Sequence, residues 1–196
     1  MRTAWGYDVT GELDPIISVD DFNEMTGGVY ASNPRAEAAL KAASQAIRNY
    51  CGWHICPSMA CTANPEGGAV VARLPAVYVS AISKITENGT VLTTDGYQWR
   101  KDGLVKRSFP YVWSDVWGGL EIEYTAGFSA DAVPDLAEAV CAITAGVLAV
   151  AAGVTSESAD GVSISYSSSA SSIAAGLTSQ QKSALIPYKV VNSHAA

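Results

Sequence analysis

Positive charge is scarce in this chain of 196 residues. Lys and Arg number 12 against 19 Asp and Glu, which gives a formal net charge of −7. Proteins that bind nucleic acid tightly draw most of their affinity from a positive field, so this chain is not expected to bind DNA in that way. The acidic balance instead favours solubility, or a surface to which phosphate does not adhere.

Residues typical of catalytic sites are also few. Only two histidines occur, and His194 stands close to the end of the sequence. No serine has the flanking glycines of a nucleophile elbow, and no glycine pair is followed by the Lys-Ser or Lys-Thr of a phosphate-binding loop. We therefore expect no catalytic residues and no cofactor.

Cysteine is limited to four residues, and the first 14 residues lack the apolar core of a signal peptide. Free thiols in a reducing cytoplasm are the expectation. Cys51, Cys56 and Cys61 stand around His54, but their spacing does not match that of a zinc module. We expect small buried side chains here and no metal.

Long hydrophobic runs are absent as well. The longest apolar run without a charge, Ala139 to Thr155, is rich in Ala and Gly, which predicts a helix packed against protein and not a membrane span.

The most informative stretch runs from residue 119 to residue 153. Leu120, Ile122 and Tyr124 alternate with Glu121 and Glu123, which is the period of a half-buried strand. A long helix is expected to begin at Pro134, with Asp131 as its cap. Its aliphatic stripe is joined by small side chains almost all round, so a second face is expected to be covered by a neighbouring subunit. The candidates for this subunit interface are Ala139, Ala142, Ala145, Gly146 and Ala149.

Two further helices are expected before this stretch. Ser18 and Asp21 resemble a capping box for a short helix up to Thr26. Asn33 and Pro34 begin an amphipathic helix that is expected to pack on the helix from Pro134.

Short strands with frequent turn signals fill residues 69–125. Asn88-Gly89 is the strongest hairpin signal, because both central residues of that turn need positive φ. Such spacing is typical of a small antiparallel meander or barrel.

The loop at 109–119 is rich in aromatic residues. Trp113 and Trp117 either pack inside the β block, which is the favoured interpretation, or anchor a protein interface. Four basic residues precede the loop and form either a solvated hairpin or a contact with DNA or an acidic partner: Arg100, Lys101, Lys106 and Arg107.

The last part of the chain, 155–196, is rich in serine and predicts a flexible arm. Thr178 and Gln181 form a capping-box pattern for a short helix at about 179–186. A helix this short must dock on its own chain or on a neighbour. Leu185 and Ile186 are candidates for the subunit interface, and Tyr188 is a candidate for contact with a partner protein.

The sequence thus predicts an α+β fold, in which a small helical bundle carries an inserted antiparallel β meander or barrel and is followed by a flexible C-terminal arm. Residues 1–154 form one domain, with a helical base at 18–52 and 133–153 and a β insert at 69–125.

The order of these features resembles the phage head–tail connector, or adaptor, proteins of the gp6-like and gp15-like group, which includes gene transfer agent adaptors. The stretches that carry the resemblance are SVDDFNEMTG, AIRNYCGW, RLPAVYVSAISKITENGTVL, DGYQW, GGLEIEYTAGF, VPDLAEAV and GVSISY.

The resemblance implies a structural protein of the virion and no enzyme. Such a protein forms an oligomeric ring, expected to be a dodecamer, under the portal protein. The ring extends the channel for double-stranded DNA without sequence-specific binding and receives a tail-side stopper or terminator protein. Glu121, Glu123 and the four basic residues are then candidates to face the channel.

Two other functions stay open from the residues alone. A binding module could use Trp99, Trp113 and Trp117 to hold a ligand, such as a sugar, or another virion protein. An enzyme could use Glu121 and Glu123 as acid and base, although a solvated acidic strand face is the favoured interpretation.

Overall fold

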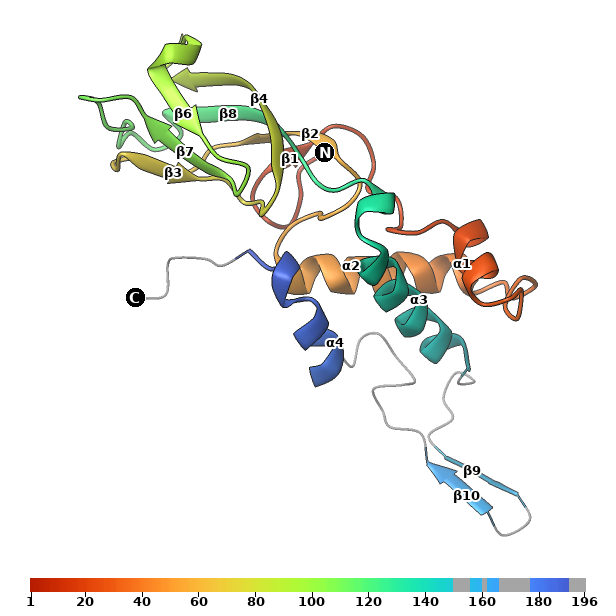
Figure 1. The fold of residues 1–196 in the computed structure, drawn as a ribbon. Coiled ribbons are helices and arrows are strands. Elements are labelled where there is room, and N and C mark those ends of the chain that lie inside the picture. The colour runs from red at the N-terminus through yellow and green to blue at the C-terminus, as the bar shows by residue number, and fades with distance from the viewer. Residues whose placement is uncertain (150–155, 160–161, 166–176, 191–196) are drawn as a thin grey trace. The chain divides into compact units, whose positions relative to one another are not determined.

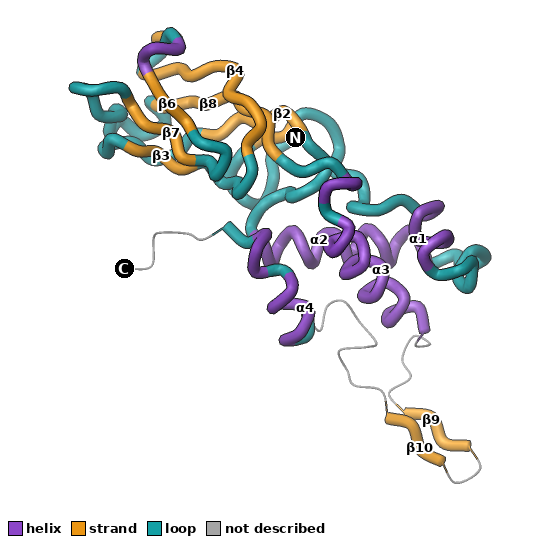
Figure 2. The backbone as a smooth tube through the Cα atoms, in the orientation of Figure 1, coloured by secondary structure: helices purple, strands orange, loops and turns teal. Residues whose placement is uncertain are grey.

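The structure is a computed structural model, and it describes residues 1–149, 156–159, 162–165 and 177–190. The chain forms two compact units, each built from separate segments. We call the first the sheet unit, which comprises Met1–Leu13, Gly52–Ser129 and Tyr188–Ala196. We call the second the helical unit, which comprises Asp14–Cys51 and Ala130–Pro187. Figure 2 shows the strands that dominate the one and the helices that dominate the other.

The helical unit contains four helices: α1 (Val19–Met25), α2 (Ala36–Cys51), α3 (Pro134–Ala149) and α4 (Ser179–Ala184). Helix α2 packs against α3, as predicted (Figure 1). The capping boxes at Ser18 and Thr178 are both confirmed. Helix α2 begins at Ala36 and not at Pro34, and the side-chain oxygen of Asn33 accepts a hydrogen bond from the backbone N–H of Arg35 in the turn before the helix. Asp131 does not cap α3, because it lies in a separate 3-10 turn, Ala130–Ala132.

One charged residue, Arg48, lies on the buried face of α2, although charged residues of an amphipathic helix usually face solvent. Arg48 is buried, and its guanidinium donates a hydrogen bond of 2.7 Å to the carbonyl oxygen of Asp14. Ser44 is buried too, and its hydroxyl oxygen accepts a hydrogen bond from the backbone N–H of Ile16. Both contacts attach the segment before α1 to α2.

The larger sheet of the sheet unit has the strand order β1-β2-β8-β4-β5. Its strands are β1 (Asp8–Val9), β2 (Met59–Ala63), β4 (Val79–Glu87), β5 (Thr90–Val91) and β8 (Leu120–Ala126). The alternation predicted at residues 120–124 is confirmed, with Leu120, Ile122 and Tyr124 buried. The hairpin at Asn88-Gly89 is confirmed as well, with φ values of 49° and 79°.

A second sheet has the order β3-β7-β6, with β3 (Val71–Arg73), β6 (Tyr97–Trp99) and β7 (Leu104–Arg107). All strand pairs in both sheets are antiparallel. Both sheets are open in the described part of the chain, so the insert is not a closed barrel. The buried side chains of the sheet unit include Trp53, Val105 and Trp113.

His54 is buried in the sheet unit, and both of its ring nitrogens have partners. Nε2 lies 2.9 Å from the carbonyl oxygen of Ala126, which can only accept, so Nε2 carries the proton. Nδ1 lies 2.8 Å from the hydroxyl of Tyr7 and therefore accepts. Through these two hydrogen bonds His54 links residue 7 to the end of β8.

The remaining described strands are β9 (Ser156–Ala159) and β10 (Val162–Ser165), which pair antiparallel. The predicted strand near Val162 is confirmed. The rest of the serine-rich segment, the predicted helix end at Gly153 and the residues after Val190 lie outside the described ranges. Among the described helices, none combines the length and the apolar character needed to cross a bilayer.

Candidate functional site

Within the described residues, helix α3 has one buried face and one face that no other segment buries. The covered face consists of Leu136, Val140, Ile143, Thr144 and Leu148. The other face carries the small side chains that the sequence singled out. Of these, Ala142, Gly146 and Ala149 are exposed, and Ala139 and Ala145 are half-buried. We call these five residues the small-residue face.

Gly146 is the most informative residue of the small-residue face. A glycine inside a helix costs about 0.5–1 kcal/mol relative to alanine. At Gly146 an added Cβ would meet nothing within 4 Å outside the helix's own backbone. Nothing in the described chain therefore requires a glycine here. A close approach from another molecule is a physical reason for it.

The second exposed apolar surface is the aromatic loop, residues 109–119. Phe109 is 95% exposed and Trp117 is 97% exposed. Tyr111, Val112 and Val116 are also largely exposed. Five large apolar side chains are thus exposed within nine residues, and exposed apolar surface of this kind is typical of interaction sites.

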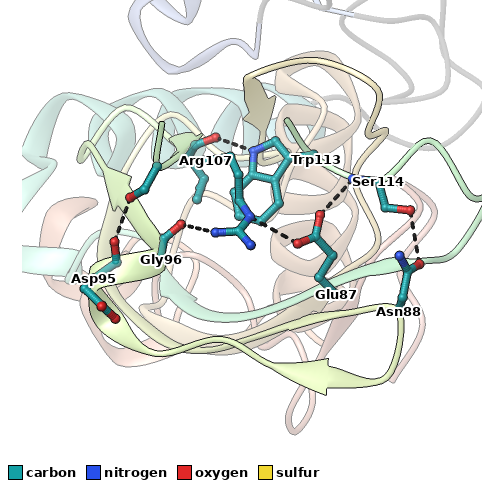
Figure 3. Close-up of polar contacts among 9 residues, drawn as sticks. Glu87, Asn88, Asp95, Gly96, Arg107, Trp113 and Ser114 are labelled. Atoms are coloured by element: carbon teal, nitrogen blue, oxygen red, sulfur yellow. Dashed lines mark hydrogen bonds and ion pairs between the residues drawn. The ribbon is translucent and has the colours of Figure 1, made fainter. Parts of the chain in front are cut away.

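The base of the aromatic loop is rigid (Figure 3). Trp113 is buried, and its Nε1 donates a hydrogen bond of 3.0 Å to the carbonyl oxygen of Val105. The backbone N–H of Ser114 donates to the carboxylate of Glu87 at 2.8 Å. Trp113 therefore packs inside the β block, which was the favoured expectation, and its side chain offers no surface to a partner.

The guanidinium of Arg107 also contacts residues at the base of the aromatic loop. Its Nε lies 3.1 Å from the Glu87 carboxylate, and its NH1 donates to the carbonyl oxygen of Gly96 at 2.6 Å. Its guanidinium also lies 5.6 Å from the ring centre of Trp113. The Arg107 and Glu87 side chains are only 12% and 13% exposed, so Arg107 belongs to the core and is not free to meet DNA.

The other three basic residues do not form one cluster with Arg107. Lys106 is exposed on the opposite face of β7. Arg100 and Lys101 are exposed in the turn between β6 and β7, where Arg100 pairs with Asp102 at 2.7 Å. Trp99 is half-buried at the end of β6, at a different site from Trp117. The three tryptophans of the ligand-binding hypothesis are therefore not gathered in one site.

Glu121 and Glu123 share the outer face of β8 and are both half-buried. Glu123 lies 2.8 Å from the ammonium of Lys84 on the neighbouring strand β4. This hydrogen bond and charge pairing raise the pKa of Lys84. Glu123 and Lys84 therefore form a cross-strand ion pair on the outer face of the sheet. A solvated acidic strand face was the favoured interpretation of Glu121 and Glu123, and the ion pair agrees with it.

The C-terminal segment docks on its own chain. Leu185 is buried in the helical unit, where its carbonyl oxygen lies 3.9 Å from the Cys51 thiol. Its side chain is 1% exposed and is therefore buried within its own chain. Ile186, by contrast, is 62% exposed.

In the sheet unit, the carbonyl oxygen of Tyr188 accepts a hydrogen bond of 2.6 Å from Trp53 Nε1. The Tyr188 ring also meets the ring of Phe128 edge-on. Tyr188 is half-buried by these contacts within its own chain.

Three of the four cysteines are buried, and none of the described ones is in a disulfide. Burial raises the pKa of Cys61 to about 12, so its thiol stays protonated at neutral pH and is a poor nucleophile. Among the described residues, no group of His, Cys, Asp and Glu is arranged to hold a metal ion.

The described residues thus form an α+β fold with exposed apolar side chains on α3 and on the aromatic loop. Comparison with known proteins agrees. Residues 15–180 match the family described as HCP, head completion protein. The chain therefore belongs to the head completion protein family, a family of structural head–tail adaptors. No curated protein matches the sequence.

Two solved structures share the fold. One is described as "Neck of native GTA particle computed with C12 symmetry"; a chain of it aligns with a TM-score of 0.65 at 16% identity, over 97% of this chain and 98% of that chain. The other is described as "Neck of empty GTA particle computed with C6 symmetry"; its chain aligns with a TM-score of 0.56 at 20% identity, over 76% and 88%.

Proposed function

We propose that this protein is a head–tail adaptor that assembles into a ring under the portal in the neck of a phage or gene transfer agent particle. Its role is structural, and no catalytic step is assigned to it. Membership of the head completion protein family supports the proposal, and so does the full-length match to a chain from a neck with C12 symmetry. A ring of twelve copies is the assembly that this match favours.

The observation that carries the proposal is the uncovered small-residue face of α3. In a ring each subunit contacts two neighbours through two different patches of its surface. Alanine and glycine let a neighbouring helix approach closely, and Gly146 has open space beside it. Ile186, exposed just after α4, is a further contact residue for a neighbour.

The remaining charges fit a channel for DNA. The net charge of −7 disfavours tight binding to phosphate, so double-stranded DNA can pass without being held. Glu121 and Glu123, on the solvated face of β8, are the side chains that we assign to the channel wall. We assign the aromatic loop to contacts with other proteins. The partners in the virion are the portal protein and a tail-side stopper or terminator protein.

Cryo-electron microscopy of the protein bound to its portal tests this proposal. The expected image is a closed ring of adaptor subunits at the portal, with α3 at the boundary between subunits. A protein that stays monomeric in the presence of its portal, and is missing from the neck of purified particles, would show that the proposal is wrong.

A further inference from the structure

The aromatic loop is one wall of a groove with acidic edges. The groove has a volume of about 450 Å³, and its opposite wall is the segment from Asn64 to Gly67. Val116 and Trp117 supply apolar surface to it, and Asp115 and Glu66 supply carboxylates. An occupant that fits this lining carries positive charge next to apolar atoms.

The walls of the groove are fixed before any partner binds. The backbone N–H of Gly68 donates to the carbonyl oxygen of Trp113 at 2.9 Å, and the backbone N–H of Trp113 donates to the carbonyl oxygen of Ala69 at 2.9 Å. At Gly67 a side chain would overlap the carbonyl group of Ser114, so the two walls are in direct backbone contact. A preformed groove loses little conformational entropy on binding.

A surface with the complementary chemistry lies elsewhere on the same chain. The β6–β7 turn, residues 100–103, exposes Arg100 and Lys101. The turn is rigid as well, because its carbonyl oxygens accept hydrogen bonds from the backbone N–H groups of Val79 and Leu74, at 2.7 and 2.8 Å. Among the described residues Lys101 forms no ion pair, which leaves its ammonium available to a carboxylate.

The turn and the groove lie at opposite ends of one strand. The turn comes directly before β7, and the aromatic loop comes directly after it. Four residues of strand span about 13 Å. Two complementary patches at different places on one subunit are what a head-to-tail contact between copies needs, and such a contact generates a ring when the rotation from copy to copy closes.

We infer that the β6–β7 turn of one copy enters the groove beside the aromatic loop of the next copy around the ring. Lys101 pairs with Asp115 of the neighbouring copy, and Arg100 lies against the face of Trp117 there, where a guanidinium is attracted to the indole. This inference rests on the proposed ring and names a second contact between its subunits, separate from α3.

A charge exchange tests the contact. Lys101→Glu and Asp115→Lys each place like charges opposite one another, and each is expected to lower the fraction of protein in rings by about tenfold. The double variant carries both changes and restores opposite charges, so it is expected to assemble within about threefold of the unchanged protein. Lys106→Glu is the matched control, since it makes the same charge change on the exposed middle of β7 and is expected to assemble normally.

Both changed side chains are exposed, so all variants are expected to keep the unfolding midpoint of the unchanged protein. Mass photometry of the full chain with its portal measures the ring fraction. A zero-length carbodiimide cross-link between Lys101 and Asp115, identified by mass spectrometry in the ring fraction alone, would locate the contact directly.

The outcomes separate the two proposals. If rings form but carry no such cross-link and both single variants assemble normally, the inference is overturned and the ring stands. If the single variants form rings but no longer attach tails, the groove takes a tail-side protein, and the inference is again overturned. If the unchanged protein forms no ring at all, the proposed function and this inference fail together.

Discussion

Replacing Gly146 by alanine separates what α3 does in a single chain from what it does in an assembly. In the single chain the added methyl group meets nothing within 4 Å outside the helix's own backbone. It also removes the entropic disadvantage of a glycine within a helix, about 0.5–1 kcal/mol. For a chain of this size, 1 kcal/mol corresponds to a rise of about 2–4 °C in the unfolding midpoint.

In the ring the same methyl group is expected to act in the opposite direction. If a neighbouring helix packs against the small-residue face, an added side chain separates the two backbones, at a cost of about 1–3 kcal/mol for each overpacked contact. Gly146→Ala is therefore expected to raise the thermal stability of the subunit and to lower the fraction of rings. Ala142→Leu, with a larger side chain on the same face, is expected to abolish assembly.

The assay combines thermal unfolding of the isolated chain with mass photometry of its mixture with the portal. Ala42→Leu is the matched control, because Ala42 is also an exposed alanine in a helix of 16 residues, α2. Normal assembly of both Gly146→Ala and Ala142→Leu would refute close packing on this face. A lower unfolding midpoint for Gly146→Ala would show that the face is covered by the chain itself.

Three further predictions concern the stability of the sheet unit, each measured as a shift in the urea midpoint. Arg107→Met leaves the Glu87 carboxylate without its cation and is expected to destabilise by about 3 kcal/mol; adding Glu87→Gln should recover part of this, and no recovery would contradict a charge pair. Gly127→Ala is expected to cost more than about 2 kcal/mol, because φ is +107° and a Cβ would overlap the carbonyl oxygen of Pro57. Burial raises the pKa of Cys61 from an ordinary 9.0 to about 12. Below pH 9 the thiol is protonated in both the folded and the unfolded chain, so its contribution to the free energy of unfolding is complete there. As pH rises from 9 towards 12, the unfolded chain loses this proton first, and the free energy of unfolding is expected to fall. Cys61→Ala should fall less steeply over that range, and an equal slope would disprove the role of this thiol.

Local signals in the sequence were reliable wherever one short segment determines the geometry. The capping boxes at Ser18 and Thr178 need residues only three positions apart, and both form. The Asn88-Gly89 turn needs two positive φ angles in succession, which only a few residue types adopt easily. The family resemblance rested on the order of such segments, and it is confirmed.

Contacts between distant segments could not be predicted in the same way. Trp113 and Trp117 stand four residues apart, yet one is buried and the other is 97% exposed. Arg107 was grouped with its basic neighbours, but its partner Glu87 comes from another sheet 20 residues earlier. Asp131 was predicted to cap α3, but it lies in a separate 3-10 turn that precedes the helix.

The sequence alone determined the α+β composition, the caps, the hairpin and a helix with more small apolar surface than one chain needs. Each depends on the periodicity or the turn geometry of neighbouring residues, which the chain carries locally. Only the tertiary structure decided which surfaces remain uncovered. Burial is a property of all segments together, so Leu185 is buried, whereas Trp117 and most of the small-residue face are exposed in the described chain.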